Sequence, residues 1–198
     1  MYLKEEITST TIIEKSRFIC YMKHIKSEKE YKQYLLEIRK KHYDATHVCS
    51  AMICHNIQRS NDDGEPSGTA GMPILNILLK NNLDETCAIV VRYFGGIKLG
   101  ASGLIRAYGN SVKNTLQLAT LLQDEQYDEY HLTLDYETAN KLEYYLRNNT
   151  VLLNTKYDQD VTFDFAINDE TILNKILEIS KGVKPEYIGK KIIAKVVK

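Results

Sequence analysis

The residues TCAIVVRYF at positions 86–94 constrain the fold more than any other stretch of the chain. A strand with one face in water alternates between apolar and polar residues, but this run is apolar almost throughout. We therefore expect a central strand that is covered on both faces.

Two glycine-rich loops flank this strand. DDGEPSGTAG (62–71) leads into an apolar run in which Pro73 fits only the first turn of a helix, over 73–79. GGIKLGASG (95–103) leads into residues 104–122, where apolar side chains recur every four residues. Both loops are therefore predicted to end in a helix, and Gly109 inside the second helix indicates a close approach of another group there.

The other segments of the first half are predicted from composition and spacing. Ser27 and Glu30 have capping-box spacing, which favours a helix over 27–42. β-branched and aromatic residues favour a strand pair or one bent strand over 10–25, and a strand over 47–57.

A second pattern begins after the acidic segment 123–130, which we interpret as a link with few core residues. The predicted order is βαββαβ, the ferredoxin-like unit, with Asn168 capping the last helix and Gly182 ending it. Its elements are a strand at 131–136, a helix at 137–149, a hairpin of 150–157 and 161–167, a helix at 168–181 and a strand at 191–198. We therefore expect an α+β protein with domains at 1–126 and 127–198.

Composition narrows the classes of function. Of the 198 residues 43% are apolar, so the chain should fold, and 26 basic against 26 acidic residues argue against nucleic-acid binding by bulk charge alone. Residues 1–123 nevertheless hold 16 Lys and Arg against 12 Asp and Glu, so we expect an anionic partner to contact this half. Four cysteines, the lack of a membrane-length apolar segment and an N-terminus without a signal-peptide pattern indicate a cytoplasmic protein.

Metal and nucleophile chemistry are the first hypotheses for a site. Four side chains of metal-ligand type lie close together in sequence: His47, Cys49, Cys54 and His55. Alternation along a strand would separate them, which favours buried thiols and a hydrogen-bonded histidine. The pattern G-x-S-x-G is absent, so Ser67 and Thr69 are expected to hydrogen-bond the loop backbone or to cap the helix that follows.

Three acidic residues of the first loop, Asp62, Asp63 and Glu65, leave three interpretations open. They bond N–H groups of their own loop, they hold Mg²⁺ together with several waters, or they neutralise basic residues of the second loop.

An anion site at the second loop is a further hypothesis. N–H groups at a glycine-rich helix start attract phosphates, and Arg92, Lys98 and Arg106 surround this loop. Neither loop matches G-x-x-x-x-G-K-[ST] or G-x-G-x-x-G. The structural alternative is that the glycines form tight turns and the basic residues provide surface solubility.

Two long strings resemble the signature of the IMPACT/YigZ family: DDGEPSGTAGMP (62–73) and RYFGGIKLGASGLIRAYG (92–109). ATH (45–47) and KSRF (15–18) fit the same family. Ser102 departs from the glycine that relatives usually have, which narrows the backbone approach that this loop permits.

The resemblance implies an N-terminal domain with the fold of the second domain of a small-subunit ribosomal protein, followed by a ferredoxin-like domain. The two together are similar to consecutive domains of translational elongation factor G. Eukaryotic relatives carry an additional N-terminal RWD domain and restrain a kinase that phosphorylates an initiation factor. This chain has no such extension, so the resemblance implies the shorter, bacterial-type branch, for which nucleic-acid binding is inferred from the fold.

We predict a non-enzymatic, translation-linked regulatory protein that binds RNA or a ribosome-associated partner, without a membrane, a metal or a tightly bound cofactor. The alternatives are an enzyme that acts on a small phosphorylated ligand with Mg²⁺, and a module that binds only proteins. No catalytic residue is predicted. The predicted binding residues come from both loops: Asp62, Asp63, Glu65, Ser67, Thr69, Arg92, Gly95, Gly96, Lys98 and Arg106.

Overall fold

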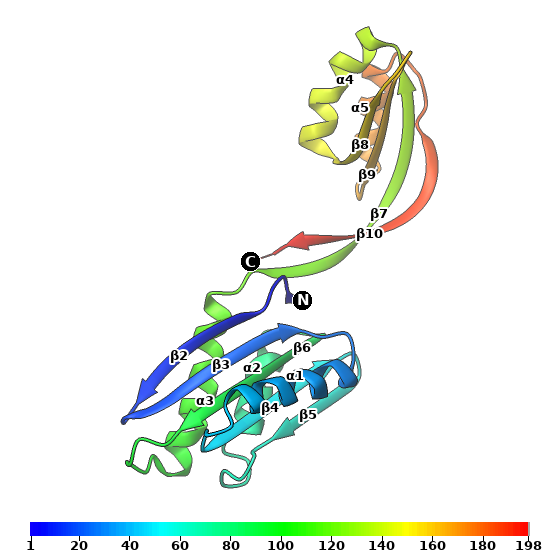
Figure 1. Cartoon of the computed structure of the whole chain (residues 1–198). Coiled ribbons are helices and arrows are strands. Elements are labelled where there is room, and N and C mark those ends of the chain that lie inside the picture. The colour runs from blue at the N-terminus through cyan, green and yellow to red at the C-terminus, as the bar shows by residue number, and fades with distance from the viewer. Residues whose placement is uncertain (198) are drawn as a thin grey trace. The chain divides into compact units, whose positions relative to one another are not determined.

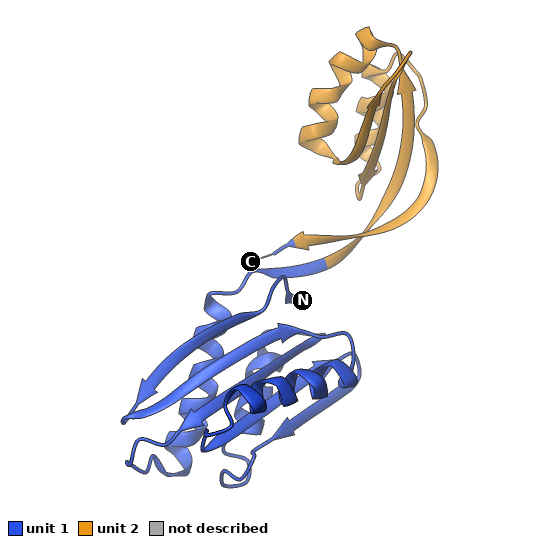
Figure 2. Ribbon diagram, in the orientation of Figure 1, with its two compact units in different colours: residues 1–123, 196–198 blue, residues 124–195 orange. Residues whose placement is uncertain are grey.

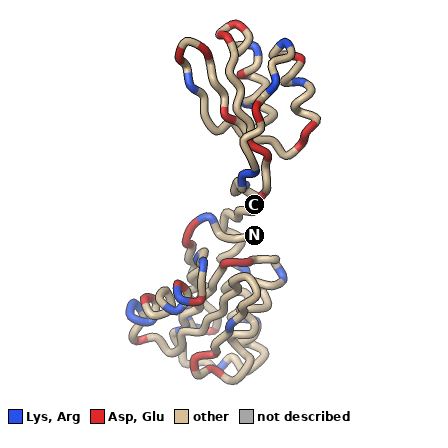
Figure 3. The backbone as a smooth tube through the Cα atoms, turned by 90° about the vertical axis from the view of Figure 1, so that its right-hand side faces the viewer, with Lys and Arg blue, Asp and Glu red and all other residues tan. Residues whose placement is uncertain are grey.

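The computed structural model describes residues 1–197 and has an α+β fold with antiparallel sheets (Figure 1). The chain divides into two compact units, Met1–Gln123 with Val196 and Val197, and Asp124–Lys195 (Figure 2). Basic and acidic residues both occur along the backbone of each unit (Figure 3). None of the helices in residues 1–197 has the length and apolar character needed to cross a membrane.

The first unit is built on a five-stranded antiparallel sheet of order β2-β3-β6-β4-β5. Its strands are β2 (Ile7–Ile13), β3 (Ser16–His24), β4 (His47–Cys54), β5 (Ile57–Asn61) and β6 (Thr86–Tyr93). β6 is the middle strand, and its side chains alternate between two cores. Ala88 and Val90 belong to one core, while Ile89 and Val91 belong to the other. The prediction of a central strand covered on both faces is confirmed.

Helices cover both faces of this sheet. α1 (Glu28–Lys41) packs on one face through Tyr31, Tyr34 and Ile38. α2 (Gly71–Lys80) and α3 (Gly100–Gln117) pack on the other face. Each large apolar side chain buried in these layers contributes about 1.5–3 kcal/mol, which is why the two helical layers hold the sheet without disulfides. Both glycine-rich loops lie at helix starts in the second of these layers.

Capping and turn residues set the boundaries of the predicted elements. Ser27 Oγ accepts a hydrogen bond from the Glu30 N–H at 3.2 Å, which confirms the start of α1. Glu14 and Lys15 adopt positive φ between β2 and β3, so the segment 10–25 is a strand pair rather than one bent strand. β5 is an addition to the predicted strand at 47–57, and composition does not indicate it because all its residues are exposed.

The second unit follows the order β7-α4-β8-β9-α5-β10. Its elements are β7 (Leu121–Leu134), α4 (Tyr136–Asn149), β8 (Val151–Tyr157), β9 (Val161–Ile167), α5 (Thr171–Ile179) and β10 (Glu186–Val196). β7 pairs with β9 and β10, and β9 pairs with β8. Both helices pack on the sheet in one core that includes Leu142, Phe163 and Ile176. A short strand, β1 (Tyr2–Leu3), pairs with the first residues of β7.

The acidic segment 123–130 begins at the boundary between the two units and holds few core residues, as predicted, but it forms part of the strand β7. Its acidic side chains contact the neighbouring strand β10. Asp128 accepts a hydrogen bond from the Tyr187 hydroxyl at 3.3 Å, and Glu129 pairs with Lys191 at 3.0 Å. Cross-strand pairing of this kind stabilises a sheet without apolar residues. The sequence did not predict this strand, because strand prediction relied on core-forming residues alone.

Two predictions about single residues in helices are also wrong. α5 begins at Thr171, whose N–H donates to Asp169 at 2.9 Å, so Asn168 does not cap it. At Gly109 an added Cβ would meet no atom within 4 Å, so no group approaches closely there. Gly182 adopts φ +90° after α5, and its predicted role in ending that helix is confirmed.

Candidate functional site

Asp62 occupies the start of α2. Its carboxylate accepts hydrogen bonds from the N–H groups of Gly68, Ala70 and Gly71 at 2.8–2.9 Å. A helix leaves such donors unpaired, and no side chain at Ala70 caps them. Burial alone would raise the pKa of Asp62, but the three backbone hydrogen bonds together lower it below the ordinary 3.8. Asp62 therefore fills the anion position of this helix start with a group from the chain itself.

The other polar residues of the first loop also bind within the chain. Asp63 accepts a hydrogen bond from a backbone N–H of β4 at 2.7 Å and pairs with Arg39 of α1. Thr69 donates its hydroxyl to the Pro66 carbonyl at 2.6 Å, which agrees with the expected bond to the loop backbone. The side chain of Ser67 is exposed. Contacts within the chain thus hold the first loop in place.

Glu65 joins the first loop to the end of β6. Its Oε1 accepts hydrogen bonds from Arg92 Nη1 at 2.6 Å and from the Tyr108 hydroxyl at 2.7 Å. Glu65 is 8% exposed and Arg92 is 5% exposed. Burial, reinforced by Cys49 and Glu65, raises the pKa of Tyr108, so its hydroxyl remains a donor. A buried charge without a partner is costly, so Glu65 and Arg92 neutralise each other. This is one of the three interpretations of the acidic loop, and it applies to Glu65.

His47 of β4 lies beside this pair with a fixed ring orientation. Its Nδ1 is 2.8 Å from the carbonyl oxygen of Asp63. A carbonyl can only accept, so Nδ1 carries a hydrogen, and in the neutral ring Nε2 is an acceptor. Nε2 lies 3.8 Å from Glu65 Oε2. In the neutral ring, two acceptor atoms therefore lie next to each other.

The second glycine loop is constructed differently. Gly95 packs against the turn between β2 and β3 so closely that a Cβ would lie 2.0 Å from the carbonyl carbon of Lys15. Gly96 adopts φ +86° and has open space beside it. In residues 1–197 no side chain caps α3 at Leu99, and the first turn holds no acidic residue. The start of α3 therefore has no counterpart of Asp62.

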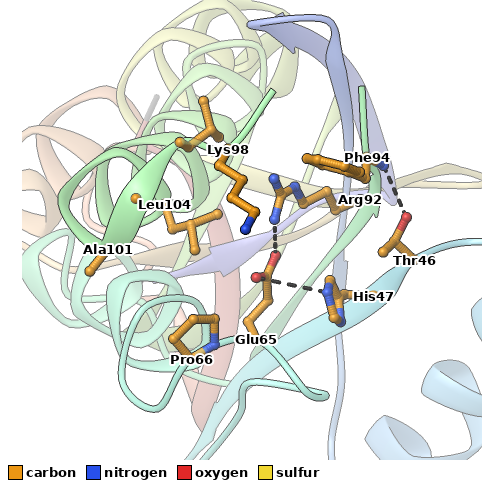
Figure 4. A pocket seen from close by; sticks show the side chains of 11 residues that line it. Thr46, His47, Glu65, Pro66, Arg92, Phe94, Lys98, Ala101 and Leu104 are labelled. Carbon is orange, nitrogen blue, oxygen red and sulfur yellow. Dashed lines mark hydrogen bonds and ion pairs between the residues drawn. The ribbon is translucent and has the colours of Figure 1, made fainter. Parts of the chain in front are cut away.

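A pocket of about 370 Å³ lies between the two loops (Figure 4). Glu65, Arg92 and His47 form its polar end. Figure 4 shows the side chain of Lys98 pointing toward Glu65 and Arg92. The remaining walls come from Thr46, Pro66, Phe94, Leu99, Gly100, Ala101 and Leu104. The pocket thus combines apolar walls with a small charged end beside an uncapped helix start.

Lys98 and Arg106 form an exposed basic surface next to this pocket. Both line a neighbouring hollow of about 580 Å³ together with Asn110 of α3 and Glu14. Within residues 1–197 neither cation makes an ion pair. Arg92 does not share this surface, because it belongs to a strand that is covered on both faces.

The residues of the two metal hypotheses do not converge. Asp62, Asp63 and Glu65 bind three different sets of partners. Within residues 1–197 no three His, Cys, Asp or Glu side chains are arranged to hold one metal ion. All four cysteines are free and buried, and burial raises the pKa of the Cys49 thiol to about 12, which suppresses thiolate chemistry at neutral pH.

Sequence reasoning located the loops but missed several residues of the site. Leu104 and Tyr108 belong to the stripe that was predicted to face the core, and Phe94 ends the predicted central strand. Their periodicity was visible, but their position beside Glu65 was not. Nothing in the sequence marks Arg39 as the partner of Asp63, because that contact depends on how α1 packs on the sheet.

Fold and site together define an α+β protein in which two glycine-rich loops enclose a small pocket. The model of the Impact N-terminal domain matches residues 14–116. IMPACT family member YvyE of Bacillus subtilis (strain 168) is 44% identical over 172 residues, which cover 85% of this chain and 79% of the relative. IMPACT family member YigZ of Escherichia coli (strain K12) is 33% identical over 185 residues, which cover 89% and 91%.

A solved structure is similar to this chain over nearly its whole length. The crystal structure of a hypothetical protein is 30% identical to this chain, with a TM-score of 0.61 and coverage of 95% of both chains. The chain belongs to the IMPACT family.

Proposed function

We propose that this chain is a non-enzymatic, translation-linked regulatory protein that binds RNA through the surface around its second glycine loop. The observation that carries this proposal is the pair of exposed cations, Lys98 and Arg106, which make no ion pair within residues 1–197. They flank the start of α3, whose N–H groups and dipole favour a negatively charged ligand. RNA phosphates have the matching charge.

Membership of the IMPACT family supports the link to translation, since eukaryotic relatives restrain a kinase that phosphorylates an initiation factor. We further propose that the first unit has the fold of the second domain of a small-subunit ribosomal protein. For the second unit we propose a ferredoxin-like fold, which the strand order β10-β7-β9-β8 supports. Such a protein would act in the cytoplasm, as its composition predicts.

The alternative of a Mg²⁺-dependent enzyme is less well supported. Asp62 is bound to the start of α2, Asp63 to Arg39 and Glu65 to Arg92. A metal ion would have to displace these partners before the carboxylates could hold it. A module that binds only proteins is the other alternative, and a test with RNA separates it from the main proposal.

The test measures binding of a fluorescein-labelled single-stranded RNA by fluorescence anisotropy over a range of salt concentrations. We expect Lys98→Ala and Arg106→Ala each to weaken binding and to reduce the slope of log affinity against log salt by about one. Lys80→Ala is the matched control, because Lys80 is an exposed cation at the C-terminal end of α2. It should leave both quantities unchanged.

Two results would contradict the proposed function. Absence of RNA binding at low salt would contradict the proposed function. An equal loss of RNA affinity in all three variants would show that RNA binds only by non-specific charge attraction. Sedimentation with ribosomes that depends on Lys98 and Arg106, without binding of free RNA, would instead favour a ribosome-associated protein partner.

A further inference from the structure

We propose that the pocket between the two loops binds one unstacked nucleotide, with the base inside the pocket and the phosphate at Lys98 and the start of α3. The choice of a nucleotide rests on the proposed function. The ligand chemistry is a nucleoside monophosphate, which either an RNA strand or a free nucleotide can supply.

The dimensions and walls of the pocket fit a flat ring. Its volume of about 370 Å³ falls in the usual range of small-ligand pockets, about 300–1,000 Å³. Pro66, Leu99 and Leu104 provide apolar walls. Phe94 also lines the pocket and is 46% exposed, although large apolar side chains are usually buried. An accessible aromatic ring is a stacking platform for a base.

The polar end of the pocket selects among bases. His47 Nε2 in the neutral ring and Glu65 Oε2 are both acceptors, and they lie 3.8 Å apart. The other oxygen of Glu65 is already engaged by Arg92 and Tyr108. Two adjacent acceptors suit a ligand group with two hydrogens, such as the exocyclic amino group of adenine, cytosine or guanine. Uracil carries no amino group and should bind more weakly.

The charges around the pocket favour an anionic ligand. Lys98 and Arg92 contribute two positive charges, and Glu65 contributes one negative charge. Arg92 Nε is buried and has no hydrogen-bond partner in residues 1–197, so the guanidinium is not fully satisfied by the chain. The first turn of α3 adds N–H groups that no side chain in the described part of the chain caps. A phosphate beside Lys98 would meet both the cation and the helix start.

A peptide is the main competing occupant. An acidic side chain could pair with Lys98, but it would bring a negative oxygen toward the two acceptors at the polar end, Glu65 Oε2 and His47 Nε2. A nucleotide carries both groups, because its amino group donates to the two acceptors and its phosphate accepts from Lys98 and the start of α3. The observations therefore favour the nucleotide.

The test uses the full chain and two variants of α3. Ala101 is exposed at the rim and lines the pocket, so Ala101→Phe should fill it. Ile105→Phe is the matched control, because Ile105 is 46% exposed on the same helix and does not line the pocket. Isothermal titration calorimetry with AMP and UMP, and anisotropy with an adenine-containing single-stranded RNA, measure binding. Circular dichroism confirms that both variants fold.

We expect Ala101→Phe to weaken AMP and RNA binding by about tenfold or more, the value of losing one stacked base. Ile105→Phe should bind like the unmodified chain, and UMP should bind about fivefold more weakly than AMP. Pocket-dependent binding of AMP without RNA binding would support the site with a free nucleotide as its source, while contradicting the proposed function.

RNA binding that depends on Lys98 and Arg106 but not on Ala101→Phe would overturn the nucleotide pocket and leave the proposed function intact. Equal binding of AMP and UMP would overturn the role given to Glu65 and His47. Binding of an acidic peptide that Ala101→Phe abolishes, with no nucleotide binding, would assign the pocket to a protein partner.

Discussion

The two glycine-rich loops look alike in sequence, yet they differ in what meets the helix that each precedes. At the first loop Asp62 bonds three N–H groups at the start of α2. At the second loop no side chain of residues 1–197 caps α3, and Lys98 and Arg106 are exposed. We therefore propose that a glycine-rich helix start binds a ligand only where the chain does not supply its own anion. The glycines of the first loop serve the architecture of the unit.

The largest effect should come from Gly95, the contact between the second loop and the β2–β3 turn. A Cβ at Gly95 would lie 2.0 Å from a backbone atom of Lys15, and backbone cannot move aside cheaply. We expect Gly95→Ala to destabilise the chain by about 4 kcal/mol or more in urea unfolding. Gly96→Ala is the control, with open space around it and only its positive φ to strain it, at about 1–2 kcal/mol. Similar losses in both variants would contradict the close packing.

The next largest effect should come from the buried pair that connects the first loop to the end of β6. Arg92→Met leaves Glu65 charged and buried with only the Tyr108 hydroxyl as a strong partner, so we expect a loss of about 3–5 kcal/mol. Adding Glu65→Gln should recover part of that loss, because the uncompensated charge is removed. Denaturant unfolding of the two single variants and the double variant measures the coupling. Additive losses would show that Glu65 and Arg92 are not energetically coupled.

A smaller effect is expected at Asp62. Asp62→Asn should cost about 1–2 kcal/mol at neutral pH, because the amide nitrogen that replaces one carboxylate oxygen cannot accept the hydrogen bond from the Gly68 N–H. The pKa of Asp62 is lowered in the folded chain, so its stabilisation is fully present above the ordinary 3.8. It is lost as the pH falls below 3.8 and through the folded pKa. Unfolding measured from pH 7 to pH 2 should therefore show the two chains converging in acid. A constant difference would argue against an ionised cap.

The smallest effect, of opposite sign, should come from Gly109 in α3. An added Cβ there meets no atom within 4 Å, and the residue lies in a helix interior. We expect Gly109→Ala to stabilise the chain by about 0.5–1 kcal/mol in thermal or urea unfolding. Destabilisation would mean that α3 needs this glycine for a contact, as the sequence alone suggested.

The limits of sequence reasoning follow from where each contact is encoded. The apolar run of β6 and the capping residues around Ser27 are local signals, and they predicted the central strand and α1. Arg92 was expected on the surface of the second loop, because a basic residue before a glycine loop usually faces water. Its burial depends on the sheet register, which places Arg92 opposite His47 and Phe18.

The acidic loop shows the same limit. Its residue types allowed backbone bonds, metal binding or neutralisation, and the structure distributes the first and third of these roles among different residues. Asp62 bonds backbone N–H groups, while Glu65 neutralises Arg92. Adjacent residues of one turn point in different directions. Their individual roles can therefore be assigned only when the positions of the neighbouring helices and strands are known. The pocket was invisible for this reason, since its walls come from four separated segments.

The most direct test of the difference between the loops is a titration of the ¹⁵N-labelled chain with AMP, followed by amide chemical shifts. We predict that the amides of residues 98–104 at the start of α3 shift, together with that of His47. The amides of Gly68, Ala70 and Gly71, which Asp62 already binds, should not shift. Shifts at the start of α2 without shifts at the start of α3 would contradict the account.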